Sequence, residues 1–266
     1  MIEVATWDDS RLDDYRLLAV PEALRTAGLF VAEGRLVVRR LLASSRFETR
    51  SVLVTPTAAR QLEPVLATVA APVLVVSQAV MNGVTGFNIH RGCLAIGVRR
   101  PLPTLDSLTP GRLRRVLALE GISNPDNVGG LFRSAAAFGV DVVVLGPHCG
   151  DPLYRKAIRT SMGAALLVPF VDAGPWPDGL QVLRAAGLAV LALTPDPAAT
   201  PIAQLALPPR VALLAGAEGP GLSADALAAA DYRARIPMTA LVDSLNVTTA
   251  ASIALHALSS AGPPDG

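Results

Sequence analysis

The sequence predicts an α/β fold with two domains. Short apolar runs that suit strands alternate with segments of helical periodicity along most of its 266 residues. The runs of the C-terminal part are almost wholly apolar, which is typical of parallel strands covered by helices on both faces. A turn-rich segment, 99–103, interrupts the alternation. We therefore place a smaller N-terminal α/β domain at residues 1–105 and a larger one at residues 106–266.

The N-terminal domain alternates helix and strand patterns. Helical periodicity predicts helices over 9–18, 35–45, 56–66 and 77–83. Apolar, β-branched runs predict strands over 29–32, 52–55, 72–76 and 93–98. On a helical wheel Arg35, Arg39 and Arg46 share one face. The planar fork of arginine suits phosphate, so this face is a candidate RNA contact, although a solvated helix face explains it equally well.

The C-terminal domain contains six apolar runs that suit buried strands. They lie at 116–119, 142–145, 165–168, 188–193, 211–215 and 234–236. One helix is expected to end at Phe138 and another to run from Val247 to Leu258. Parallel sheets bind their ligands beyond the carboxyl ends of the strands, so the loops there are the candidate site. The tail, 259–266, is rich in Ser, Gly and Pro and is expected to be disordered.

Composition and charge exclude several classes of protein. No apolar run reaches the roughly 18 residues that span a bilayer, and the acidic N-terminus lacks the plan of a signal peptide. We expect a cytoplasmic protein without a membrane segment. Two cysteines and three histidines match no disulfide, metal or triad spacing, so no metal is expected. The net charge of +1 is no global sign of a nucleic-acid binder, but arginines cluster between Arg35 and Arg60, and Arg155, Lys156 and Arg159 form a second group.

Three stretches carry candidate chemistry, and the first is 123–134. It follows an apolar strand and opens a helix that Asn127 can cap. Gly129 and Gly130 permit close approach of a backbone or a ligand. Arg133 follows six residues after Asn127, and whether the two face each other depends on where the helix begins. A solvated helix arginine is the simpler alternative for Arg133.

The other two stretches are loops at strand ends. The strand 211–215 runs into a glycine-rich loop, Gly216 to Gly221, that holds one carboxylate, Glu218. This loop lacks the Lys-Ser/Thr pair of a phosphate-binding loop, and an acid in a glycine loop such as Glu218 is more often a turn residue than a catalyst. The third stretch begins with Ile236-Pro237-Met238 and ends in a polar elbow before the last helix. In that elbow Ser244 or Asn246 would cap the helix.

Taken together, the three stretches resemble the SpoU/TrmH family of RNA ribose methyltransferases, within the SPOUT class. The pattern is Asn-x-Gly-x-x-x-Arg, then Gly-x-Glu-Gly, then Ile-Pro-Met with Ser-Leu-Asn-Val, over about residues 115–258. Each motif alone is weak, but their order and spacing are specific. The N-terminal domain is similar to the family's substrate-binding domain, which resembles a ribosomal RNA-binding protein, and the stretch 30–35 matches its usual opening.

The resemblance implies a deep trefoil knot in the C-terminal domain, S-adenosylmethionine (SAM) as the methyl donor, and a homodimer. It places the cofactor against Gly216, Glu218, Gly219, Ile236, Met238, Leu245 and Asn246. It places the catalytic polar positions at Asn127, Arg133, Glu218, Ser244 and Asn246. The implied reaction methylates a ribose 2′-hydroxyl of RNA, with rRNA as the first candidate and tRNA as the second.

The implied chemistry suits these residue types. SAM carries an activated methyl group, so the enzyme must align the hydroxyl with it and help the proton leave. Arg133 is the implied activating group, but guanidinium is effectively never deprotonated in proteins, so it can instead hold a phosphate and orient the hydroxyl. The alternative function is a catalytically silent RNA-binding or ribosome-assembly factor. All five polar positions are intact, which favours the enzyme.

Overall fold

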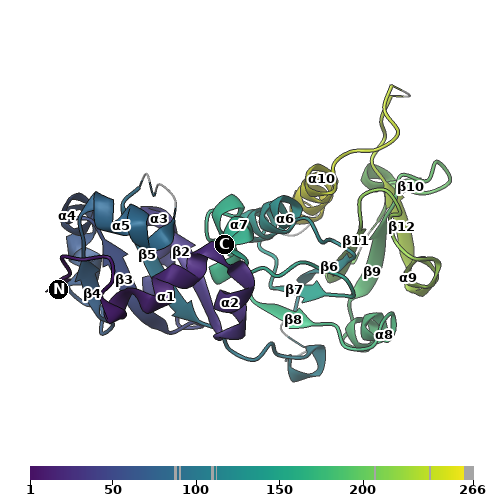
Figure 1. Ribbon diagram of the computed structural model, residues 1–266. Coiled ribbons are helices and arrows are strands. Elements are labelled where there is room, and N and C mark those ends of the chain that lie inside the picture. Colours follow the sequence, from purple (N-terminus) through teal and green to yellow (C-terminus); the bar gives the residue numbers. More distant parts are fainter. Residues whose placement is uncertain are drawn as a thin grey trace. The chain divides into compact units, whose positions relative to one another are not determined.

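The computed structural model describes residues 1–86, 89, 91–108, 111, 113–206, 208–239 and 241–260. The chain forms two compact units (Figure 1). The first contains Met1–Pro101 together with Leu153–Leu167, and the second contains Leu102–Pro152 together with Val168–Gly266. A segment from the middle of the chain thus belongs to the first unit, which a single boundary near residue 105 does not anticipate.

The first unit is built on a five-stranded sheet in the order β1-β4-β3-β5-β2. β5 runs antiparallel to both of its neighbours, β3 and β2, whereas β1, β4 and β3 are parallel. The bounds are β1 (Ile2–Glu3), β2 (Leu29–Glu33), β3 (Thr49–Val54), β4 (Val73–Val75) and β5 (Cys93–Val98). The four strands expected from apolar runs are therefore confirmed, whereas the short edge strand β1 was not predicted.

Helices of the first unit follow the strands, and side-chain oxygens cap two of them. The bounds are α1 (Asp13–Arg16), α2 (Pro21–Thr26), α3 (Arg35–Leu42), α4 (Pro56–Leu66), α5 (Gln78–Thr85) and α7 (Arg155–Thr160). Thr55 caps α4 and Ser77 caps α5, each by accepting a first-turn amide. The helix expected over 9–18 is wrong as one element, because it divides into two 3₁₀ turns and the single turn α1.

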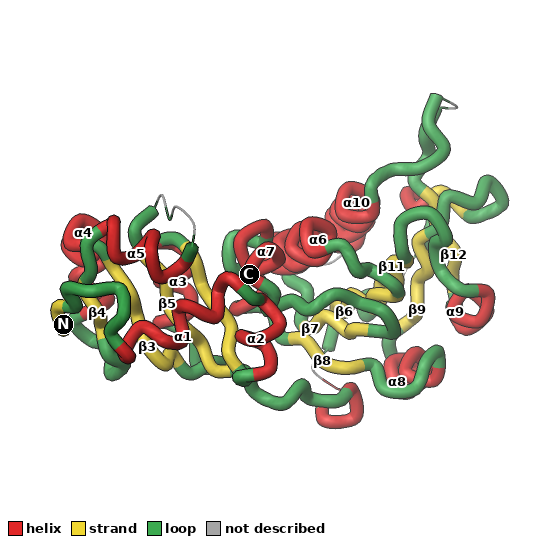
Figure 2. Tube along the Cα trace, in the orientation of Figure 1, coloured by secondary structure: helices red, strands yellow, loops and turns green. Residues whose placement is uncertain are grey.

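The second unit is built on a seven-stranded, wholly parallel sheet, which confirms the predicted parallel α/β fold. Its order is β10-β12-β9-β11-β6-β7-β8. The bounds are β6 (Arg115–Glu120), β7 (Val142–Leu145), β8 (Phe170–Asp172), β9 (Ala189–Leu193), β10 (Thr200–Pro201), β11 (Val211–Gly216) and β12 (Tyr232–Arg235). Figure 2 shows α6 (Pro125–Ala137) and α10 (Val247–Ser260) on one side of this sheet and α8 (Asp178–Ala185) and α9 (Ala224–Ala229) on the other.

One expected strand of the C-terminal part is wrong. Residues 165–168 do not pair in a sheet, because Ala164–Leu166 is a 3₁₀ turn that follows Gly163 at φ 84°. The hydroxyl of Ser161 accepts the amide of Ala165 at 3.3 Å and holds the turn. The strand itself, β8, begins at Phe170. A short apolar run is equally compatible with a buried helical turn and a buried strand, and periodicity alone cannot distinguish them.

The last helix of the chain, α10, has the buried face that its apolar spacing predicts. Val247, Ala251, Ala254 and Leu255 are all buried. The helix extends to Ser260, two residues into the segment expected to be disordered, and residues 261–266 lie outside the described residues. The trefoil knot implied by the family resemblance stays a prediction.

Helices α6 and α10 lie in close contact and run in the same direction. Ser134 and Ser252 share a hydrogen bond of 2.7 Å. One turn earlier on both helices, Gly130 faces Thr248, and a Cβ at Gly130 would lie 2.6 Å from Thr248 Cγ2. The missing side chain of Gly130 therefore sets how closely the two helices approach.

We expect Gly130→Ala to lower the free energy of unfolding by about 1–3 kcal/mol, because the new methyl group must push α10 away. The matched control is Gly83→Ala in α5, where the added Cβ would meet only Trp7, with Cβ at an ordinary 3.7 Å. That change should be neutral or stabilising, since alanine is the better helix former. Denaturant titration measures the free energy of unfolding of both variants. The same titration is applied to the double variant Gly130→Ala with Thr248→Ala. A Gly130→Ala protein as stable as the Gly83→Ala protein would contradict this account of the packing.

Candidate active site

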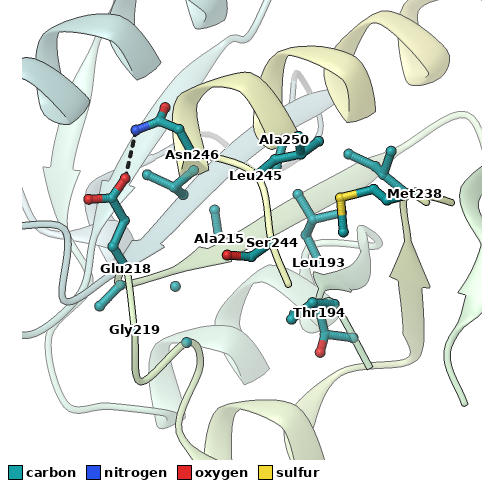
Figure 3. A pocket seen from close by; sticks show the side chains of 16 residues that line it. Leu193, Thr194, Ala215, Glu218, Gly219, Met238, Ser244, Leu245, Asn246 and Ala250 are labelled. Carbon is teal, nitrogen blue, oxygen red and sulfur yellow. Dashed lines mark hydrogen bonds between the residues drawn. The ribbon is translucent and has the colours of Figure 1, made fainter. Parts of the chain in front are cut away.

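A cavity of about 420 Å³ opens at the carboxyl ends of β9, β11 and β12 (Figure 3). Its walls come from the loops that follow these three strands and from the first turn of α10. The lining residues are Leu193, Thr194, Pro195, Ala215, Gly216, Ala217, Glu218, Gly219, Gly221, Ile236, Met238, Ser244, Leu245, Asn246, Val247 and Ala250. Glu218 is the one charged side chain among them, so the cavity combines apolar walls, exposed backbone and a single carboxylate.

The glycine loop after β11 can form only because it lacks side chains. A Cβ at Gly216 would lie 2.5 Å from the carbonyl carbon of Gly221, so the chain folds back directly onto Gly216. Gly219 and Gly221 have φ values of 87° and 72°, which favour glycine. The amide of Gly221 donates to the carbonyl of Ala217 at 3.0 Å and closes the turn. The loop thereby presents backbone atoms directly to the cavity.

Asn246 joins the three stretches that the sequence singled out. Its Oδ1 accepts the amides of Thr248 at 3.0 Å and Thr249 at 3.4 Å, so Asn246 rather than Ser244 caps α10. Its Nδ2 donates to Glu218 Oε1 at 2.6 Å and to Asn127 Oδ1 at 2.9 Å (Figure 3 shows the Glu218 bond). Both ends of one planar amide are therefore occupied, and the helix start, the glycine loop and α6 are held together.

Asn127 is the third residue of α6 and not its N-cap. The expected N-cap role is wrong for Asn127, because Asn124 Oδ1 accepts the amide of Asp126 at 2.8 Å and Pro125 occupies the first helical position. Asn127 is 8% exposed. A buried amide oxygen is costly without a donor, and the nitrogen of Asn246 supplies it.

Arg133 is exposed on α6 and is not among the residues that line the cavity. It lies six residues beyond Asn127, which corresponds to about 9 Å along the helix axis and a different face of the helix. Within the part of the chain that the structure describes, its guanidinium has no hydrogen-bond or ion-pair partner. The structure thus brings Asn127, Glu218 and Asn246 into contact and places Ser244 on the cavity wall, whereas Arg133 points elsewhere.

All seven residues predicted to hold the cofactor line this cavity: Gly216, Glu218, Gly219, Ile236, Met238, Leu245 and Asn246. The sequence did not single out Leu193, Thr194 and Pro195, which line the cavity at the end of β9. The signal was present, because a strand was expected over 188–193 and ligands bind beyond the carboxyl ends of parallel strands.

The three candidate RNA-contacting arginines do not form one helical face. Arg35 and Arg39 lie on α3, and both donate to Gln61. Arg35 donates to the side-chain oxygen of Gln61, and Arg39 donates to its backbone carbonyl oxygen at 3.1 Å. Arg46 lies beyond α3, which ends at Leu42 and not at residue 45, so the helical wheel does not apply to it. Its guanidinium stacks on Phe47 at 5.1 Å from the ring centroid, and burial lowers its pKa.

Arg155, Arg91 and Arg35 all lie near the end of β2, where Glu33 is the last residue of the strand. Arg155 of α7 binds its carboxylate through Nε at 2.9 Å and through the terminal nitrogen at 2.7 Å. The side chain of Arg91 crosses Gly34, since a Cβ there would lie 3.1 Å from Arg91 Cδ. Arg35 begins α3 at the same strand end. Three arginines and one carboxylate thus lie near the end of β2, and among these groups the positive charges outnumber the negative one.

Two further features bear on the class of site. Among the described residues, no three His, Cys, Asp or Glu side chains come together as metal ligands. Over the same residues, no helix has the length and apolar character to cross a bilayer.

Comparison with known proteins identifies the family. A profile described as the SpoU rRNA Methylase family matches residues 114–256. An "uncharacterized tRNA/rRNA methyltransferase" of Mycobacterium tuberculosis is 44% identical over 261 residues, which are 96% of this chain and 90% of the relative. RlmB of a Burkholderia species, a 23S rRNA (guanosine-2'-O-)-methyltransferase, is 32% identical over 179 residues, which are 66% of this chain and 72% of the relative.

Solved structures agree with these sequence relatives. A crystal structure of an AdoMet-bound rRNA methyltransferase from Sinorhizobium meliloti is 25% identical, has a TM-score of 0.81 and is matched over 96% of both chains. A crystal structure of an RNA 2'-O ribose methyltransferase is 26% identical, with a TM-score of 0.78 and coverage of 97% of this chain and 98% of the other. The profile covers more than half of this chain, and the chain belongs to the SpoU rRNA methylase family.

Proposed function

We propose that the protein transfers a methyl group from SAM to a ribose 2′-hydroxyl of rRNA, with tRNA as the second candidate substrate, in the cytoplasm. The observation that carries the proposal is the amide of Asn246, which joins all three motif stretches at the mouth of one cavity. The activities named for the relatives, a 23S rRNA guanosine 2′-O-methyltransferase among them, support the reaction type.

The cavity suits SAM in size and chemistry. Its volume of about 420 Å³ lies within the range of small-molecule sites, roughly 300–1,000 Å³. SAM, when bound, supplies a methyl group on a positively charged sulfonium. Glu218 is the one carboxylate of the lining and offers charge complementarity to that cation, while the glycine backbone of Gly216–Gly221 offers hydrogen-bonding groups without side-chain bulk. Leu193, Leu245 and Met238 provide apolar walls.

The polar residues have two proposed roles: some hold the cavity walls in place, and others bind and orient the RNA. Asn246 and Asn127 fix the walls, and Ser244 offers a hydroxyl at the cavity edge. Guanidinium is effectively never deprotonated in proteins, so the role of Arg133 is to bind phosphate and orient the ribose hydroxyl rather than to accept the proton.

We expect Asn246→Asp to abolish methyl transfer and to weaken SAM binding by about tenfold or more, because a bond to a charged group is worth roughly 1.5–3 kcal/mol. Aspartate still caps α10, but it places a second carboxylate against Glu218 where the amide donated at 2.6 Å. Calorimetry with SAM in excess chelator measures the change. Asn124→Asp is the control, since it alters an asparagine cap on α6 that does not line the cavity. Equal SAM affinity in the two variants would contradict the assigned role of Asn246.

RNA should bind the basic surface of the first unit, with Arg35, Arg39 and Arg46 contacting phosphates. The triple alanine variant should weaken RNA binding and reduce the slope of log K against log salt by about 0.7–0.9 for each phosphate that is no longer bound. The control replaces Arg11, Arg25 and Arg50, which lie in the same unit and are paired with carboxylates. The control removes the same charge as the first variant. An equal reduction of the salt slope in both triple variants would mean that the slope depends on net charge and not on phosphate contacts of these particular arginines.

We propose further that two copies of the chain share each active site in a homodimer. Arg133 lies outside the cavity of its own chain, which is explained if it serves the cavity of the partner. Leu241, Val242 and Ile253, in and before α10, are 90%, 53% and 41% exposed, as expected of an apolar surface that a second copy covers.

Arg133→Ala and Asn246→Asp dimers should each be inactive, and refolding the two together should restore activity. In a mixed dimer one site then carries both lesions and the other carries neither, so activity per mixed dimer reaches up to about half of the wild-type value by symmetry. Methyl incorporation into RNA before and after subunit exchange measures this. No recovery after confirmed exchange would mean that Arg133 acts within its own chain.

A further inference from the structure

Glu120, at the end of β6, is a buried carboxylate that does not line the cavity. It is 8% exposed, and a buried charge must be well hydrogen-bonded to be tolerated. Three donors meet it. Oε1 accepts Trp176 Nε1 at 2.8 Å and Ser223 Oγ at 2.7 Å, and Oε2 accepts the amide of Ser223 at 2.9 Å.

Glu120 contacts the glycine loop at both of its ends, through its backbone at the start and through its side chain at the end. Glu120 pairs with Gly216 in the parallel ladder of β6 and β11, at the point where the loop begins. Ser223 comes two residues after Gly221, where the loop ends, and it caps α9 by accepting the amide of Ala226 at 3.2 Å. One residue thus links the start of the loop, by strand pairing, to its end and to the cap of the next helix, by side-chain hydrogen bonds.

A loop with three glycines needs such an anchor. Glycine has more backbone freedom in the unbound state than other residues, so ordering the loop on ligand binding is costly. A protein that holds the loop in place beforehand reduces that cost and binds more tightly. We propose that Glu120 is a positioning residue for the cofactor: through Ser223 it preorganises the glycine loop that forms the cavity wall. This inference rests on the proposed binding of SAM.

The test uses Glu120→Gln, which keeps the shape of the side chain. If its oxygen still accepts from Trp176 and the Ser223 hydroxyl, its NH₂ group faces the Ser223 amide and that bond cannot form. The Kd for SAM and the KM for SAM should rise about tenfold, whereas kcat at saturating SAM should change less than about twofold. Ser223→Ala should weaken SAM binding in the same direction, and Ser223→Thr, which restores the hydroxyl, should recover wild-type affinity.

The matched control is Asp141→Asn. Asp141 Oδ2 accepts the amides of Arg114 at 2.6 Å and Arg115 at 2.8 Å, so it anchors the opposite, amino-terminal end of β6. Asparagine can still accept both amides through its one oxygen but lacks the charge, so the anchor is weakened; this should cost stability and leave the Kd for SAM unchanged. Equal effects of Asp141→Asn and Glu120→Gln on SAM binding would overturn the proposal in favour of a general loss of stability.

A second readout needs neither activity nor SAM. Hydrogen exchange at the amides of 217–223 should quicken in Glu120→Gln and stay unchanged in Asp141→Asn. Replacing Trp7 with Phe leaves Trp176 as the sole tryptophan, and its emission should shift in Glu120→Gln because its indole donor no longer has a charged acceptor. Wild-type protein that fails to bind SAM would refute the proposed function, while quickened exchange would still support the anchor. Wild-type binding with unaltered Kd and exchange in Glu120→Gln would refute the anchor alone.

Discussion

The active site depends on the two ends of one amide group. The oxygen of Asn246 caps α10 and its nitrogen reaches the glycine loop and the buried Asn127. Because the amide is planar and rigid, the start of the helix and the wall of the cavity cannot move independently. Removing it would also leave the oxygen of Asn127 buried without this donor, which is costly.

The glycine loop is constrained from two directions. Asn246 holds its middle at Glu218, and Glu120 holds its end at Ser223. The loop can therefore consist largely of glycine, which lets the backbone fold back at Gly216 and face the cavity, without remaining loose. Recognition in such a cavity comes mainly from shape and backbone groups, with a single carboxylate to provide charge.

Prediction from the sequence succeeded where the signal is local. The bounds of β5 and β7 were predicted without error, because short apolar runs between turn signals specify a strand over a few residues. It failed where two local interpretations are equally good. The run 165–168 is a helical turn because of Gly163 and Ser161, and Asn124 rather than Asn127 caps α6 because Pro125 marks the first helical position. The position of Arg46 beyond the helix end is a failure of the same kind.

By itself the sequence determined the parallel α/β class, the three motif stretches and the polar elbow in which Ser244 or Asn246 caps α10, because each is encoded within a dozen or so neighbouring residues. Only the tertiary structure decided that Asn127 meets Asn246 across 119 residues, that the end of β9 completes the cavity, and that Leu153–Leu167 packs with the first unit. Contacts between distant segments depend on how helices and strands pack. Gly130 permits the close approach of α10 to α6, yet no local sequence pattern predicts that Gly130 faces Thr248.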